Sequence, residues 1–542
     1  MKSHRTSPSL HLLLISATFG AALLGYVAVI WSGGLRGYSP SRTVAARDIA
    51  FFLPIIAAFF WLTRRQRFRG EMMLLTAAVF LFVFGQVMQY RLFSDPEYGA
   101  RGAARANARE TKAQTVRLLN IETGYDDEKK TFMFGSPTAV PRKAVQVRPV
   151  DEYSIGDILT SVNTYIPLAA LFLMVVAFRA FKKDNVLLWL QRHALLIGVG
   201  TLVPFAGLVL AFSDEGKFLG QTTPWEGVKI LFLVSFAGML ADTYRHLRLT
   251  RWGLPPSRYL LPFIVIAAMP VVPFFALSDF GQMLVFFGVY LILYVVAVRK
   301  TGQMVYGVVL VALVFGTFFV ASSAKAGLGI PRRVYFRLYQ WQHTWEPPSQ
   351  DTWWWKPDYE RYLRVTKLKP DPGDPQEIRQ RNNEAWFDKV LQQSQGLFGI
   401  NEGGVVGEGL GLGFPETVPI SDSDFIYAAI SEETGLAGGF AVLLALGVFV
   451  FAGTAISLGS KDMFTKLLAA GLTGFIAFQA VVNIGGVLRL LPMTGITLPF
   501  VSHGGWSLIT SFGMLGILLA LSHRNALVAL NAERTHREEH VR

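Results

Sequence analysis

The sequence of 542 residues contains no cysteine and few charged residues. Without cysteine the chain can form neither a disulfide nor a thiolate metal site. Only 16% of its residues are charged, whereas a soluble domain carries about 25%. Hydrophobic residues make up 52% and the mean hydropathy is +0.37. Because the apolar residues gather in long runs, the composition excludes an ordinary soluble protein and predicts an integral membrane protein.

The net charge of +13 does not indicate nucleic-acid binding. Many of the Lys and Arg residues lie in short loops between apolar runs, where they are expected to set the orientation of the spans. The N-terminus resembles a secretory signal, but no small-residue cleavage site follows its apolar run. We therefore interpret it as a first anchored helix.

Twelve apolar segments are suited to crossing a bilayer, which needs about 20 residues each, so we expect an all-α polytopic membrane protein. With the N-terminus inside, every inner loop is basic, which places both termini in the cytoplasm. One outer loop disagrees, because it carries Arg36, Arg42 and Arg47. The predicted spans are 10–31, 48–63, 72–92, 159–180, 187–212, 227–244, 259–278, 280–299, 303–323, 425–456, 463–488 and 504–523.

This topology places two long insertions outside, at about 93–158 and 324–424. The first is polar, and we assign it no chemistry. The second carries many charges and several tryptophans, among them the run Trp353-Trp354-Trp355. Aromatic side chains at this density are typical of the membrane–water interface. We expect the second insertion to be a working element rather than a linker.

The segment GVVGEGLGLGFPETVPISDSDFIYAAISEETG (404–435) combines a glycine run with acids. It lacks the Lys-Ser/Thr ending of a phosphate loop and is not a nucleotide site. Asp424 opens a predicted span, and Glu432 and Glu433 follow about two turns inside it. Ionised carboxylates at that depth cost about 3 kcal/mol each, so they usually line a wet cavity or pair with cations. The alternative is that they cap or pair structurally.

Further polar residues lie at the outer ends of other spans. Glu226 and Lys229, three residues apart, face one side of a helix, where a local ion pair is the alternative to a binding role. The segment PMTGITLPFVSHGGWS (492–507) separates two apolar runs and combines prolines, glycines and hydroxyl side chains. We interpret it as a backbone held in one shape beside a polar group.

These segments together resemble the SEDS family of shape, elongation, division and sporulation proteins (RodA, FtsW and SpoVE). The 492–507 segment is similar to the family signature Pro-x-Thr-Gly-x-x-Leu-Pro-x-x-Ser-x-Gly-Gly-x-Ser. Four further elements agree in order and side: Gln479 with Asn483-Ile484-Gly485, SDFIYAAISEETG, PWEGVK and Asp279-Phe280-Gly281. The resemblance covers about 72–523 and implies ten core spans. The two spans before it are then an N-terminal addition.

The resemblance implies five regions. They are the two-helix addition 1–71, the first seven core helices at 72–323 (which include the insertion 93–158), the outer loop 324–424, the last three core helices 425–523, and the basic cytoplasmic tail 524–542.

The resemblance also implies a reaction. Such a protein polymerises lipid II into glycan strands at the outer face of the bacterial cytoplasmic membrane, beside a class B penicillin-binding transpeptidase, for cell shape, elongation or division. Inversion at the sugar needs a general base and cationic help for the departing pyrophosphate. No cofactor is certain. A divalent cation such as Mg²⁺ or Mn²⁺ suits the pyrophosphate, although no ligand set is visible.

The family base is an aspartate in the outer loop, where this chain departs from the pattern. We rank Asp374 first, Asp371 second and Glu346 third, with an ordinary Asp-Pro turn as the alternative. Arg489, where the family has a small residue, is either an interface anchor or a pyrophosphate ligand. The residues expected to bind substrate are Glu226, Lys229, Arg337, Gln393, Ser394, Asp424, Glu432, Glu433, Thr494, Thr497 and Ser502.

Two other functions compete with polymerisation. Twelve spans with glycine, proline and buried acids also suit a secondary transporter or a flippase for the lipid-linked precursor. Against this, the sequence shows no internal repeat, and its candidate chemistry lies at one side of the membrane. The incomplete base motif keeps open a third function, that of a non-catalytic scaffold for the transpeptidase.

Overall fold

A computed structural model describes residues 7–95, 161–212, 225–248, 280–298, 332–366 and 374–541, with the short pieces 98, 125–126, 131–132, 156 and 368. The predicted spans 259–278 and 303–323, the candidate base Asp371 and most of the first insertion lie outside the described residues.

The described part of the chain is almost entirely helical. Its one sheet is a small antiparallel pair, β1 (Tyr125–Asp126) and β2 (Thr131–Phe132). The helices are α1 (Pro8–Leu35), α2 (Arg42–Ala50), α3 (Phe52–Phe60), η1 (Trp61–Arg65), α4 (Met73–Ser94), α8 (Val162–Phe181), α9 (Asp184–Arg192), α10 (Ala194–Phe212), α11 (Trp225–Leu247), α14 (Phe280–Val298), α16 (Arg332–Gln342), α17 (Lys356–Val365), α18 (Pro375–Gly403), η4 (Pro415–Thr417), α19 (Ile426–Gly459), α20 (Met463–Val487) and α21 (Gly505–Val541).

The all-α polytopic fold is confirmed. Within the described ranges, nine helices are long and apolar enough to cross a membrane, and α2, α3 and η1 together form one of them. The count of twelve is not confirmed, because two of the predicted spans lie outside these ranges. The predicted span 187–212 is divided into α9 and α10 at His193.

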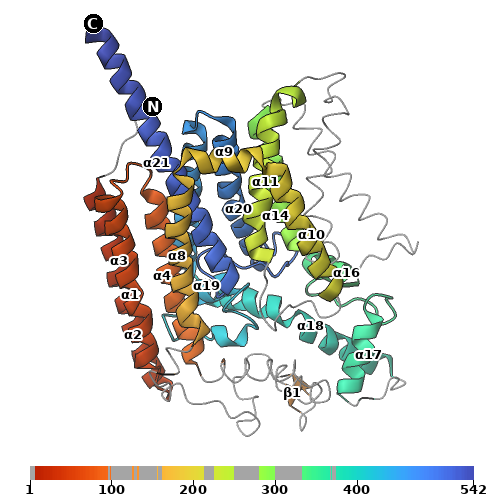
Figure 1. Cartoon of the computed structure of the whole chain (residues 1–542). Helices are drawn as coiled ribbons and strands as arrows, with labels where there is room; N and C mark the ends of the chain where they lie inside the picture. The colour runs from red at the N-terminus through yellow and green to blue at the C-terminus, as the bar shows by residue number, and fades with distance from the viewer. Residues whose placement is uncertain are drawn as a thin grey trace.

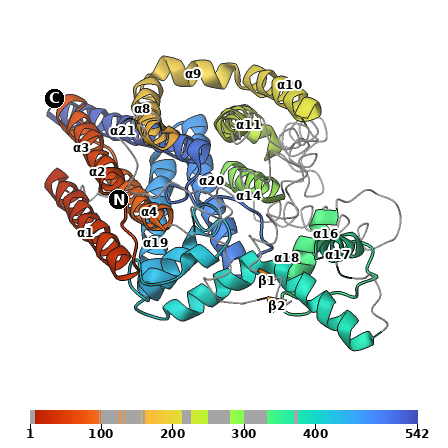
Figure 2. The ribbon, with the colours of Figure 1, turned by 90° about the horizontal axis from the view of Figure 1, so that it is seen from below.

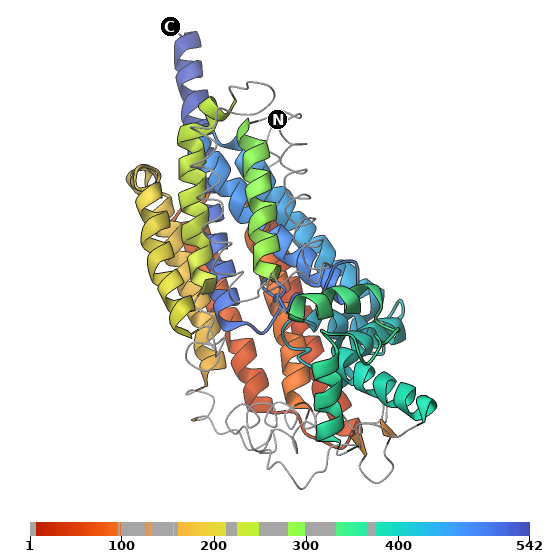
Figure 3. The same ribbon diagram turned by 90° about the vertical axis from the view of Figure 1, so that its right-hand side faces the viewer.

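The long helices run side by side as one bundle. Helix α1 begins and α21 ends at one end of the bundle, and α16, α17 and α18 lie at the opposite end (Figure 1, Figure 3). Seen along the bundle, α1 lies on one flank beside α4, and α9 and α10 curve around another (Figure 2). Helix α20 packs against α11, α14 and α19, so it lies in the middle of the bundle.

The tryptophan-rich outer segment builds its own small core between α16, α17 and α18. Trp354, Trp355 and Trp386 are buried there, while Trp353 is exposed. Two indole N–H groups find partners: Trp355 donates to Asn382 Oδ1 at 2.8 Å, and Trp386 donates to the carbonyl of Thr344 at 2.9 Å. Three of the six tryptophans of this segment therefore stabilise the segment itself, and the interface role expected of the tryptophans stays a prediction for the others.

Two helices differ from their predicted bounds. Helix α21 does not end near 523 but continues to Val541, because residues 524–541 contain no glycine or proline and include many good helix formers. Helix α19 is broken at Gly435, whose φ of 67° and ψ of −167° are not helical. A short helical segment at 426–434 therefore precedes the long spanning part.

Candidate functional site

The signature loop 492–507 is fixed to α20 by two side-chain amides. Gln479 donates to the carbonyl of Thr497 at 3.0 Å, and Asn483 donates to the carbonyl of Ile496 at 2.6 Å. The Thr497 hydroxyl donates to Ser507 Oγ at 2.7 Å. These bonds satisfy a backbone that forms no helix or strand, so the loop has the fixed shape expected from its sequence.

The same loop is fixed to the segment that precedes α19. The Ser502 hydroxyl donates to the carbonyl of Ser423, and the backbone N–H of His503 donates to the carbonyl of Asp422 at 2.8 Å. Asn483 also donates to the carbonyl of Asp424 at 2.8 Å. One amide on α20 thus holds the loop and the Asp424 segment together.

Asp424 is buried without a cationic partner among the described residues. Its carboxylate accepts from Ser423 Oγ at 3.2 Å and from the Gln392 amide at 3.4 Å to each oxygen. A side chain at Gly495 of the signature loop would place its Cβ 3.8 Å from Asp424 Oδ2. Burial raises the pKa of Asp424 to about 6. A carboxylate with this pKa is ionised at pH 7 and still able to take a proton.

Helix α18 reaches Asp424 because glycines let it approach α19 closely. A Cβ at Gly396 would lie 2.7 Å from the ring of Phe425, and one at Gly399 would clash with Glu432. Gln392, one turn before Gly396, is thereby brought to Asp424. The close packing of α18 on α19 fixes the position of the Gln392 amide.

Lys229 and Glu226 form a buried ion pair on α11. Lys229 Nζ lies 2.5 Å from Glu226 Oε2 and 5.3 Å from the ring centroid of Phe475 on α20. Phe475, Gln479 and Asn483 are four residues apart and share one face of α20. The Lys229 pair, the signature loop and the Asp424 segment therefore follow one stripe of α20, over about 12 Å of helix rise.

Glu432 and Glu433 face a different set of partners. Glu432 Oε1 accepts from the N–H of Phe414 at 2.5 Å, and Glu433 Oε2 accepts from the N–H of Gly411 at 3.0 Å. Both partners belong to the glycine-rich segment. The structure therefore does not bring these two acids together with Asp424, and their contacts are those of the structural alternative.

The glycine-rich segment fills the break in α19. The N–H groups of Glu408 and Gly409 donate to the carbonyls of Glu432 and Glu433 at 3.0 and 2.9 Å. In return, the carbonyl of Gly404 accepts from the N–H of Leu436 at 2.9 Å. The approach requires glycine, because the φ of Gly407 is +90° and a Cβ there would clash with the carbonyl of Glu433.

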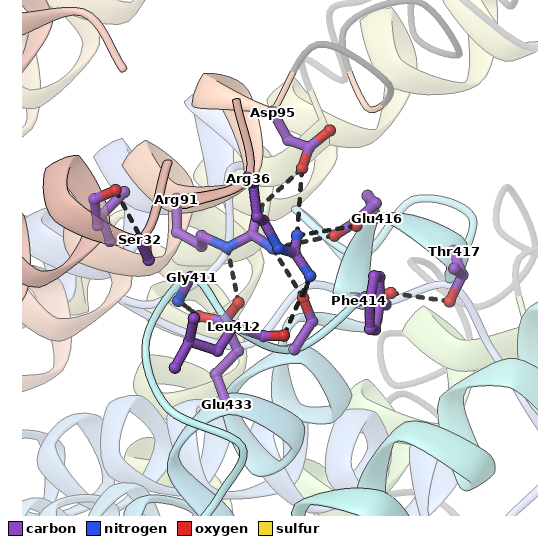
Figure 4. A network of polar contacts seen from close by, with 12 residues as sticks. Ser32, Arg36, Arg91, Asp95, Gly411, Leu412, Phe414, Glu416, Thr417 and Glu433 are labelled. Carbon is purple, nitrogen blue, oxygen red and sulfur yellow. Dashed lines mark hydrogen bonds and ion pairs between the residues drawn. The ribbon is translucent and has the colours of Figure 1, made fainter. Parts of the chain in front are cut away.

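A buried charge network lies beside this segment (Figure 4). Arg91 of α4 is fully buried and binds Glu433 at 2.6 Å, Glu416 at 3.0 Å and Asp95 at 3.3 Å. Arg36 contacts Glu416 at 3.2 Å and lies 4.4 Å from the ring centroid of Phe414. Burial raises the pKa of the Glu416 carboxyl, and Arg91 opposes that effect.

Sequence reasoning missed this network. Arg91 was the available signal, since an arginine near the end of an apolar span needs a partner. Two of the three arginines in the outer loop that disagreed with the predicted topology have acidic partners. Arg36 is paired with Glu416, and Arg47 forms a pair with Asp48 at 2.7 Å.

Two arginines join the outer segment to the last core helices. Arg337 of α16 donates to the carbonyl of Thr494 at 3.4 Å. Arg489 donates to the carbonyls of Trp341 and Gln342 at 2.8 and 2.7 Å. The Trp341 indole donates back to the carbonyl of Arg489 at 3.0 Å. Arg489 thus fixes the outer segment to the chain that follows α20, and its two expected roles, interface anchor and pyrophosphate ligand, stay predictions.

The remaining candidates lie on or near α18 and stay predictions. Asp374 is the exposed N-cap of this helix and accepts from the N–H of Gln376 at 2.9 Å, about 27 Å of helix rise from Gln392. Ser394 bonds the carbonyl of Val390, and Gln393 is fully buried with no partner for its amide among the described residues. Glu346 is exposed and contacts His343 at 3.0 Å.

In the part of the chain that the structure describes, no group of three or more His, Cys, Asp and Glu side chains could hold a metal ion.

The chain is similar to named bacterial proteins over most of its length. The RodA peptidoglycan glycosyltransferase of Mycobacterium tuberculosis is 30% identical over 371 residues, which cover 65% of this chain and 68% of that protein. Stage V sporulation protein E of Bacillus subtilis is 27% identical over 361 residues, 66% of this chain and 83% of that protein. The probable FtsW peptidoglycan glycosyltransferase of B. subtilis is 42% identical over 134 residues, 24% of this chain and 33% of that protein.

Two solved structures are also similar. The crystal structure of the Thermus thermophilus rod shape determining protein RodA has 20% identity and a TM-score of 0.31, covering 66% of this chain and 96% of that chain. A chain from a peptidoglycan synthase complex that coordinates polymerization and crosslinking has 19% identity and a TM-score of 0.37, covering 67% and 97%. The family profile of FtsW, RodA and SpoVE, described as cell cycle proteins, matches residues 218–527. The chain belongs to the FtsW/RodA/SpoVE family.

Proposed function

We propose that this chain is a peptidoglycan glycosyltransferase that polymerises lipid II into glycan strands at the outer face of the bacterial cytoplasmic membrane. Family membership and the names of its relatives support the activity. The observation that carries the proposal is the attachment of the signature loop, Asp424 and the Lys229 pair to one face of α20. The loop-rich end that holds this site is then outside, and both termini are cytoplasmic.

The base is a carboxylate that accepts the proton of the attacking sugar hydroxyl. Asp424 suits this role, because its carboxylate is buried beside the signature loop, has no cationic partner among the described residues, and has a pKa raised to about 6 by burial. Asp374, favoured by the family resemblance, is the alternative. It is exposed and caps α18, so it would serve only if the acceptor sugar reached that end of the helix.

The leaving pyrophosphate needs positive charge. Lys229 and Arg337 are the candidates: Arg337 bonds the Thr494 carbonyl of the signature loop, and Lys229 lies over the ring of Phe475 on α20. Because Glu226 already neutralises Lys229, a Mg²⁺ or Mn²⁺ ion that enters with the pyrophosphate would supply the missing charge. We further propose a class B penicillin-binding transpeptidase as the partner, with a role in cell shape or division.

One assay tests the function. Purified protein is incubated with fluorescent lipid II, with and without a cognate class B penicillin-binding protein, and the products are separated by length. Polymer is the expected result. Movement of lipid II between leaflets without polymer would instead indicate a flippase, and neither activity would indicate a scaffold.

The same assay distinguishes the two candidate bases. Asp424→Asn and Asp374→Asn each remove one carboxylate while keeping its shape. Glu377→Gln is the matched control, because Glu377 is an exposed α18 acid paired with Arg381. We expect Asp424→Asn alone to abolish polymer formation.

A further inference from the structure

A cavity of about 440 Å³ lies beside the C-terminal part of the signature loop. Helices α2, α4 and the start of α8 form its walls, and Ser502, His503 and Gly504 line it from the loop. This volume falls within the range of small-molecule sites, about 300–1,000 Å³. None of the residues proposed above as base or pyrophosphate ligand lines the cavity.

One wall of the cavity belongs to the N-terminal addition. Val44, Arg47 and Asp48 of α2 line it, and they lie before residue 72, where the family resemblance begins. Asp48 is buried, and its carboxylate accepts from Arg47 Nε at 2.8 Å and contacts Arg47 Nη2 at 2.7 Å. The added helix therefore brings a charged pair to the cavity, although the pair carries no net charge.

The lining is uncharged overall and rich in neutral hydrogen-bonding groups. The lining also contains His503. Burial lowers the pKa of His503, which keeps its ring neutral at pH 7. Gln86, Gln89 and Asn163 contribute amides. A pyrophosphate would find no unpaired cation among these lining residues, and burying its charge there would be costly.

Apolar and aromatic surface completes the site. Tyr90 and Phe93 of α4 and Ile166 of α8 line the same cavity. Amides, hydroxyls and one neutralised ion pair beside aromatic rings suit a ligand with many hydroxyl groups and no charge. A sugar ring has that chemistry.

We propose that this cavity is a subsite for an uncharged N-acetylhexosamine unit of a glycan, with α2 of the N-terminal addition as one wall. The inference rests on the proposed function, because the growing strand supplies the sugar. The strand is held at the cavity while the reacting end lies across the signature loop, near Asp424. The N-terminal addition thereby keeps the product bound between successive transfers and lengthens the strands.

The binding test uses a diazirine-bearing N-acetylglucosamine tetramer with the purified full-length protein. After illumination, mass spectrometry maps the labelled peptides. We expect labels within 44–48, 86–94 and 161–167. Val44→Phe fills the cavity from α2 and should lower labelling about tenfold, a loss of about 1.4 kcal/mol in binding. Leu53→Phe is the matched control, since Leu53 lies in the same addition and is 70% exposed.

A second variant and a second readout complete the test. Asn163→Leu removes an amide without adding a ring, so it replaces Val44→Phe if that variant melts at a lower temperature than the wild type. With lipid II, both variants should give shorter strands at an unchanged rate of the first transfer. Labels elsewhere on the protein, or labelling that neither variant lowers, would overturn the subsite.

The subsite and the proposed function fail separately. A protein that binds the tetramer in the cavity but makes no polymer keeps the subsite and refutes the polymerase. A protein that makes polymer but takes no label in the cavity supports the polymerase and refutes the subsite.

Discussion

Asp424, just before the short helical segment 426–434, and Glu433, near its end, have opposite surroundings. Glu433 binds Arg91 at 2.6 Å and the N–H of Gly411 at 3.0 Å. Among the described residues, Asp424 has only hydroxyl and amide contacts, the nearest of them at 3.2 Å from Ser423 Oγ. A carboxylate paired with a cation holds the fold together, whereas a carboxylate without a cationic partner is able to exchange a proton. Ten residues of sequence, 424–433, thus contain two acids with structural contacts and one, Asp424, that is the proposed base.

Removing Arg91, the cation that pairs with Glu433, should have the largest effect on stability. Arg91→Ala leaves Glu433 and Glu416 buried without their main partner, which we expect to lower the free energy of unfolding by about 3–5 kcal/mol. Denaturant titration in detergent measures it. Arg36→Ala is the control, because Arg36 is partly exposed and also bonds Glu416; we expect a loss of about 2 kcal/mol. Equal losses would contradict the ranking.

Neutralising Asp424, the acid without a cationic partner among the described residues, should stop the reaction and leave the fold intact. Asp424→Asn removes the proposed base, so polymerisation should fall about 10²–10⁴-fold. The melting temperature should not fall, because the carboxylate forms no ion pair among the described residues. Polymer length and rate from fluorescent lipid II give the first value and thermal unfolding the second. Full activity in Asp424→Asn would remove this residue from the mechanism.

The pH dependence should separate catalysis from stability. Because the pKa of Asp424 is about 6, the rate should fall tenfold per pH unit below 6 and level off above about 7. The contribution of Asp424 to the free energy of unfolding changes in the opposite direction. Because the folded pKa of Asp424 lies above the unfolded value of about 3.9, that contribution is largest at low pH and is lost as the pH rises through 6. If the rate and the stability instead rose together with pH, a group other than Asp424 would be the base.

The smallest effect is expected at the other candidate base. Asp374→Ala removes the N-cap of α18 and should cost about 1 kcal/mol of stability. Asp374→Asn keeps a capping side chain and should change neither stability nor activity. If Asp374→Asn abolished polymer formation while Asp424→Asn did not, the outer-loop carboxylate would be the base.

The sequence predicted those parts of the site that are local in the chain. Glu226 and Lys229 lie three residues apart, and their pairing follows from helical spacing. Gln479 and Asn483 were predicted to lead into the signature loop, and they bond its backbone. Both cases need only one helix and the loop that follows it.

The missed parts join segments far apart in the chain. Arg91 binds Glu433 across 342 residues, and Arg36 meets Glu416 across 380. No spacing rule predicts such partners, because they depend on how the spans pack. The break at Gly435 was missed for a related reason: its backbone groups bond the glycine-rich segment some 30 residues earlier, so the apolar run alone suggested one continuous helix.

The length of α21 has a mechanical consequence. Its 37 residues form one helix of about 55 Å that starts at the signature loop and ends beyond the end of the bundle at which α1 begins (Figure 1). Arg524, near the middle of this rod, is tied to Asp184 and Asp462 on two other helices. The two ion pairs hold the middle of α21 against its neighbours, so a force on the protruding end would be transmitted along the helix toward the signature loop.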